Sequence, residues 1–115
     1  MKALAPTLKE RKRYILFKIF TDLEVEKAEV LEQVTKACLQ FLGQLGVARA
    51  GPQFLPESWD KKNKTGIIRI GHKYVNEAKA ALALVKEIGE ARVTFACLLV
   101  SGSIKKLKEA QKKVK

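Results

Sequence analysis

The sequence has few of the residues from which enzyme and metal sites are usually built. It contains 115 residues, with a single histidine and two cysteines, too few for the Cys and His sets of a structural zinc site. No Ser–His–Asp set with credible spacing and no phosphate-binding P-loop occurs in it. We therefore expect a chain that is not catalytic by itself, with no catalytic residues, no metal site and no cofactor of its own.

Long apolar segments are also missing. No stretch approaches the roughly 20 apolar residues that a membrane span requires, and the N-terminus lacks the apolar core of a secretion signal. Cys38 and Cys97 lie inside apolar patterns, which favours small buried side chains in a reducing compartment over a disulfide. We expect a cytoplasmic protein that does not contact a membrane.

Acidic residues are scarce relative to basic ones. The chain has 23 Lys and Arg against 12 Asp and Glu, a formal net charge of +11 at pH 7. Such an excess repels itself on a small domain unless a polyanion neutralises it. Nucleic acid is the usual polyanion, and the release of its counterions supplies much of the affinity. The charge therefore predicts a protein that binds nucleic acid but does not identify which one.

Hydrophobic patterning predicts both strands and helices. Runs rich in β-branched and aromatic residues predict strands at 14–20, 53–59, 67–70 and 92–100. Apolar residues at helical spacing predict helices at 25–45, 74–88 and from 104 onward. Residues 21–24 match a capping box at the start of the first helix. Gly46 and Gly89 are the expected C-terminal stops of the first two helices.

The element order βαββαβ is that of a ferredoxin-like, RRM-like α+β fold, here with an additional C-terminal helix. We expect one domain over 1–115, with an N-terminal arm at 1–10 and a basic helix at 103–115. Right-handed crossovers place the first and third strands in the centre of a four-stranded antiparallel sheet. The strand that contains Pro56 then lies at an edge, where a residue without an N–H is tolerated.

Both long helices should cover one face of this sheet, which leaves an apolar second face. Such a face is normally covered, either by the terminal helix of the chain or by another protein. The third strand has no aromatic residue, which argues against base stacking on the sheet, and Tyr14 is the one stacking candidate there. The residues proposed to contact a protein partner are Tyr14, Leu16, Phe20, Trp59 and Leu107.

Basic residues gather at strand ends, in one loop and at the start of the terminal helix. The Ser101–Gly102–Ser103 segment could cap that helix or hold a phosphate at its free N–H groups. An ordinary solvated basic face is the competing interpretation. The proposed RNA-binding residues are Arg11, Lys12, Arg13, Lys61, Lys62, Lys64, Arg69, His72, Lys73, Ser101, Ser103, Lys105, Lys106 and Lys108.

Three segments together resemble the archaeal ribonuclease P protein component 2 family. They are Arg11-Lys12-Arg13-Tyr14-Ile15-Leu16-Phe17-Lys18-Ile19, the segment from Thr65 to Val75 followed by Ala80-Ala81-Leu82, and Val100-Ser101-Gly102-Ser103-Ile104-Lys105-Lys106. The resemblance implies an RRM-like fold in a subunit of ribonuclease P, the RNA-based endonuclease that removes the 5′ leader of precursor tRNA.

The resemblance also implies the partners. These are the ribonuclease P RNA, which is the catalyst and works with magnesium, ribonuclease P protein component 3, and indirectly precursor tRNA. Self-association within a heterotetramer with component 3 is a further implied possibility. The expected role is to shield charge and to stabilise the shape of the catalytic domain of the RNA.

Two other function classes compete with this one. A ferredoxin-like regulatory module would gain thermal stability from a small ligand. A protein adaptor would bind a partner protein but no RNA, whereas a subunit that binds RNA should lose affinity steeply with added salt.

Overall fold

The computed structural model describes residues 11–113. The elements are β1 (Lys12–Phe20), α2 (Lys27–Ala50), β2 (Gln53–Asp60), β3 (Thr65–Gly71), the 3-10 helix η1 (His72–Tyr74), α3 (Val75–Ala83), β4 (Glu87–Ile88), β5 (Ala91–Arg92), β6 (Thr94–Ser101) and α4 (Ile104–Lys113). Four strands form one antiparallel sheet in the order β2-β3-β1-β6. The predicted α+β fold and its strand order are confirmed, with Pro56 on the edge strand β2.

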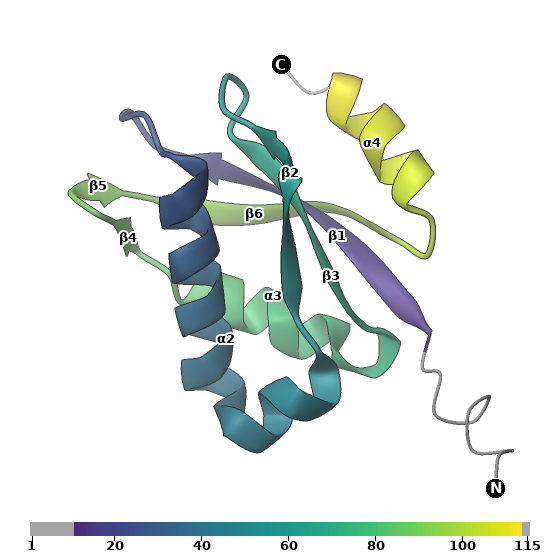
Figure 1. Ribbon diagram of the computed structural model, residues 1–115. Coiled ribbons are helices and arrows are strands. Elements are labelled where there is room, and N and C mark those ends of the chain that lie inside the picture. The colour runs from purple at the N-terminus through teal and green to yellow at the C-terminus, as the bar shows by residue number, and fades with distance from the viewer. Residues whose placement is uncertain (1–10, 114–115) are drawn as a thin grey trace, which may run out of the picture.

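The helices lie in two layers, one on each face of the sheet (Figure 1). On one face, α2 and α3 pack over the larger part of the core, in which Phe17, Ile68 and Leu82 are buried. On the other face lies α4, drawn in yellow in Figure 1. There Leu107 packs with Leu16, and the second face is therefore covered by the terminal helix of the chain itself.

Helix α2 departs from the predicted boundaries at both ends. It begins at Lys27 rather than near residue 25, and the Glu29 carboxylate accepts the Glu26 N–H at 3.2 Å. The predicted capping box at 21–24 is wrong: Thr21 Oγ1 accepts only the Leu23 N–H, in a turn outside the helix. The negative charge of Glu29 in the first turn also suits the positive end of the helix dipole.

Glycine sets the later course of α2, but not at the predicted position. Gly46 does not end the helix. The backbone is non-helical at Gly43, where φ is 76°, and the helix continues after this kink to Ala50. Gly51 then ends it in the left-handed conformation, which a residue without a Cβ adopts at little cost.

The second helix is shorter than its sequence pattern predicts. It ends at Ala83, and the segment expected to complete it forms the small hairpin β4–β5 instead. Gly89, the predicted helix stop, has φ 61° and lies between the two short strands. The last sheet strand accordingly begins at Thr94, two residues later than expected.

Candidate nucleic-acid interface

Strand register brings many of the predicted RNA-binding residues to one end of the sheet. β1 begins where β3 ends, because the two strands are antiparallel and Lys12 pairs with Gly71. Beyond this pair, the His72 N–H donates to the Arg11 carbonyl oxygen at 2.9 Å. We call this region the basic end; its residues are Arg11, Lys12, Arg13, Arg69, His72 and Lys73.

The start of α4 belongs to the same region. Ser101 at the end of β6 pairs with Tyr14, one residue beyond Arg13. The Arg13 guanidinium lies so close to Gly102 that a Cβ built there would be 3.0 Å from Nη1. Lys105 and Lys106 follow in the first turn of α4, and both are exposed. The structure thus places the predicted basic residues at the strand ends and those at the start of α4 in one region.

The two serines at the start of α4 act as local hydrogen-bond acceptors. Ser101 Oγ accepts the Ser103 N–H at 3.0 Å, and Ser103 Oγ accepts the Lys106 N–H at 3.4 Å. Ser103 is therefore an ordinary helix cap. This bond occupies one of the N–H groups that could otherwise donate to a phosphate. The lysines are therefore the stronger anion contacts of this segment.

No carboxylate of the described part of the chain forms an ion pair with the basic end. Within residues 11–113, ion pairs form only from Lys61 to Glu26 at 2.7 Å and to Glu24 at 3.8 Å. Arg69 bonds instead to the neutral side chain of Gln53. The cations of the basic end therefore keep their full attraction for a polyanion.

The predicted basic loop lies at the opposite end of β1. Lys18, paired with Thr65, donates from Nζ to the Asn63 carbonyl oxygen at 3.1 Å. The structure therefore separates Lys61, Lys62 and Lys64 from the basic end. The hydrogen bond to Glu26 raises the pKa of Lys61, and that lysine has acidic neighbours. Lys108 also lies elsewhere, facing Glu57 and Asp60 of β2 across a shallow hollow.

Two of the proposed protein-contact residues are interior residues. Leu16 is 1% exposed and Leu107 is 0% exposed, and they pack in one cluster. This corrects their assignment, because neither can touch a partner while α4 is docked. Tyr14 is half-buried beside them, whereas Phe20 is 50% exposed.

Trp59 belongs to the core on the other face. Its ring packs against Phe17 and Phe54, with centroids 6.4 Å from each. Its Nε1 is buried and has no hydrogen-bond partner among the described residues. The proposed protein contact at Trp59 gains no support from this position.

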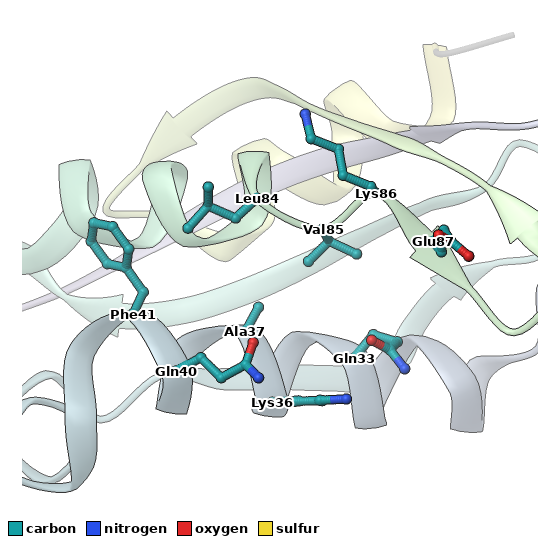
Figure 2. A pocket seen from close by; sticks show the side chains of 9 residues that line it. All are labelled: Gln33, Lys36, Ala37, Gln40, Phe41, Leu84, Val85, Lys86 and Glu87. Atoms are coloured by element: carbon teal, nitrogen blue, oxygen red, sulfur yellow. The ribbon is translucent and has the colours of Figure 1, made fainter.

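A groove between α2 and the segment after α3 was not expected from the sequence. It has a volume of about 320 Å³ and a mixed lining, in which Phe41 and Leu84 lie among polar and charged side chains. Figure 2 shows these two side chains on opposing walls, with Gln33 and Glu87 farther along. Both Phe41 and Leu84 are exposed. The sequence pattern extends the second helix to residue 88, whereas α3 ends at Ala83 and Leu84 belongs to the segment that follows it.

Neither cysteine suggests chemistry. Both are free thiols, and burial raises the pKa of Cys38 and of Cys97. At neutral pH both are therefore protonated and poorly nucleophilic. Within residues 11–113 no group of three or more His, Cys, Asp or Glu side chains is placed to hold a metal ion. None of the helices in this range is long and apolar enough to span a membrane.

Comparison with known proteins places this architecture in a family. Ribonuclease P protein component 2 of Thermococcus kodakarensis is 43% identical over 93% of this chain and 88% of its own length. The Pyrococcus abyssi protein of the same name is 42% identical over 95% and 91%. That of Methanocaldococcus jannaschii is 40% identical over 94% and 78%.

A solved structure shares the fold. One chain of the cryo-EM structure of yeast ribonuclease MRP superposes with a TM-score of 0.63, covering 90% of this chain and 93% of that one. Their sequences are only 16% identical, so this likeness concerns the fold alone. The model of the Rpp14/Pop5 family matches residues 13–112, nearly the whole described range. The chain belongs to the Rpp14/Pop5 family, together with the archaeal proteins named ribonuclease P protein component 2.

Proposed function

We propose that this chain is a protein subunit of ribonuclease P, the RNA-based endonuclease that removes the 5′ leader of precursor tRNA. Relatives that are 40–44% identical over more than nine-tenths of the chain are named ribonuclease P protein component 2. The chain itself is not the catalyst. The observation in the structure that carries its role is the basic end, where cations from β1, β3 and α4 gather without a carboxylate partner among residues 11–113.

The basic end acts through electrostatics. The catalytic RNA and its tRNA substrate are both polyanions, and they repel each other when they meet. Lysines and arginines on a rigid sheet lower this repulsion and hold one RNA shape, while releasing counterions to solution. Magnesium belongs to the RNA in this proposal. The RNA catalyses bond cleavage, and this chain supports the catalytic domain of the RNA.

The proposed protein partner is ribonuclease P protein component 3, with self-association within a heterotetramer as a further possibility. The groove lined by Phe41 and Leu84 is a better candidate for such contacts than the covered face under α4, because both of these apolar side chains are exposed. Precursor tRNA is contacted indirectly, through the RNA. We expect the assembly to act in the cytoplasm, where the two free thiols stay reduced.

Reconstitution tests the function. Ribonuclease P RNA, component 3 and this chain are combined, and cleavage of precursor tRNA is measured with each omitted in turn at a magnesium concentration that limits the RNA alone. We expect the cleavage rate without this chain to fall to the rate that is measured when this chain and component 3 are both omitted. Equal cleavage with and without the chain, or cleavage by the chain without RNA, would contradict the proposal.

A further inference from the structure

The end of the sheet opposite the basic end carries an exposed aromatic ring among lysines. β1 ends there at Phe20, beside the loop between β2 and β3. A hollow of about 210 Å³ is lined by residues of both segments. We call this region the Phe20 site; the side chains that concern the argument are Lys18, Phe20, Lys62 and Lys64.

Phe20 differs from the phenylalanines of the core. Phe17, Phe54 and Phe95 are buried, and both Phe54 and Phe95 pack against Phe17, whereas half of Phe20 is exposed. It pairs with the exposed Thr94 on the edge strand β6, outside the cluster that α4 covers. Half of the Phe20 ring is therefore accessible to a contact from outside the chain.

The lysines around the ring are oriented by backbone oxygens. Lys18 Nζ lies 5.6 Å from the centroid of the Phe20 ring and donates to the Asn63 carbonyl oxygen at 3.1 Å. Lys64 Nζ donates to the Thr21 carbonyl oxygen at 3.3 Å. These bonds orient the Lys18 ammonium beside the ring and the Lys64 ammonium in the same hollow without cancelling their charge, and Lys62 is exposed there.

The nearby carboxylate of Asp60 is used within the loop. It accepts the backbone N–H groups of Lys62 and Asn63, at 3.0 and 3.2 Å, and the Asn63 side-chain amide at 3.1 Å. It therefore shapes the turn that presents the lysines. No ion pair joins Lys18, Lys62 or Lys64 to a carboxylate within the described residues. The hollow combines net positive charge with a half-exposed aromatic ring.

We propose that the Phe20 site binds an unpaired RNA nucleotide, with its base stacked on Phe20 and its phosphate held by the lysines. A base supplies a flat π surface and a phosphate supplies the anion, which matches the two features of the hollow. The inference rests on the proposed function and deepens it. β1 spans nine residues, about 26 Å between its ends, so the basic end and the Phe20 site would contact separate parts of one RNA.

The test measures binding of the full chain to fluorescein-labelled oligouridylate of ten nucleotides over a series of salt concentrations. Phe20→Ala is expected to weaken binding about 5-fold or more, because stacking is lost. Its effect on the salt dependence should be small, since no charge is removed. Phe20→Tyr keeps a stacking ring and should bind like the wild type. The double change Lys62→Ala and Lys64→Ala should flatten the salt dependence instead.

Leu39→Ala is the matched control, because Leu39 is another exposed large apolar residue, 45% accessible, on α2. It should leave oligouridylate binding unchanged. The inference is overturned if Phe20→Ala binds oligouridylate like the wild type, if Leu39→Ala weakens that binding as much, or if Phe20→Ala weakens only the binding of component 3. It is also overturned if the wild type does not bind oligouridylate. Cleavage in the reconstituted enzyme decides the proposed function separately, so either can fail alone.

Discussion

Gly66 shows how closely single residues are fitted in this core. It lies on the central strand β3, opposite Phe17 of β1. A Cβ at this position would lie 2.8 Å from the Phe17 ring and 2.9 Å from the Phe54 ring. Both rings are buried, so neither can move aside without disturbing other core side chains. The two rings thus occupy the space that any larger residue would need.

Gly66→Ala should therefore lower the free energy of unfolding by about 1–3 kcal/mol, the usual cost of overpacking. Denaturant titration followed by circular dichroism measures it. Gly102→Ala is the control, because its nearest neighbour is the end of the Arg13 side chain, which can move. Unchanged stability of Gly66→Ala would show that the aromatic cluster is looser than described.

At the scale of elements, the start of α2 depends on Glu29. Its carboxylate accepts the Glu26 N–H, and Thr21 has no part in the helix. Glu29→Ala should cost about 0.5–1 kcal/mol through the lost bond and the lost charge at the helix N-terminus. Thr21→Ala should stay within about 0.5 kcal/mol of the wild type. Thermal unfolding measures the stability of both variants. A larger loss of stability for Thr21→Ala than for Glu29→Ala would support the predicted capping box at 21–24 instead.

The docking of α4 depends on Leu107, its one fully buried residue. Leu107→Ala should lower the free energy of unfolding by about 2–4 kcal/mol, through lost apolar burial and the cavity left behind. Leu98→Ala on β6, where the side chain is 42% exposed, should cost far less. Denaturant titration of both variants provides the comparison. Equal, small losses would mean that α4 is not fixed on the sheet.

The central strands could be predicted from the sequence, but the later boundaries could not. β1 and β3 are apolar runs, and Pro56 confines its strand to an edge, so local pattern and topology agree. After Ala83 the helical spacing of apolar residues continues without a proline or glycine until Gly89. A glycine with positive φ suits a helix end and a hairpin turn equally. The local sequence therefore does not distinguish the two, and the hairpin forms in the context of the whole fold.

The candidate site was likewise only partly predictable from the sequence. The basic end follows from antiparallel pairing of two strands, which a topology predicts. The burial of Leu16 by Leu107 depends on where a helix docks, and nothing local in the sequence states that. The sequence places Phe20 on the correct strand, but nothing local in it indicates what its ring contacts. Lys18 lies on the same strand, whereas Lys62 and Lys64 come from a loop more than 40 residues away, which only the fold brings into the same hollow.

At the scale of the whole molecule, the account is one of charge arranged on a rigid frame. The net charge of +11 is unevenly placed: the basic end has no ion pairs within the described residues, while Lys61 faces two glutamates. Total charge alone would give binding to any polyanion, whereas this placement gives a defined contact surface. Variants that remove equal charge from different places can separate these two explanations.

The most direct test is a magnesium titration of precursor tRNA cleavage by the reconstituted enzyme. One variant changes five residues of the basic end and the start of α4 to alanine: Arg11, Lys12, Arg13, Lys105 and Lys106. A matched control removes the same charge on α2, α3, the small hairpin and the last turn of α4: Lys27, Lys79, Arg92, Lys112 and Lys113. We predict that the first variant loses activity most at low magnesium and recovers as magnesium rises, while the control follows the wild type. Identical magnesium profiles for all three, or an equal shift in both variants, would contradict the account.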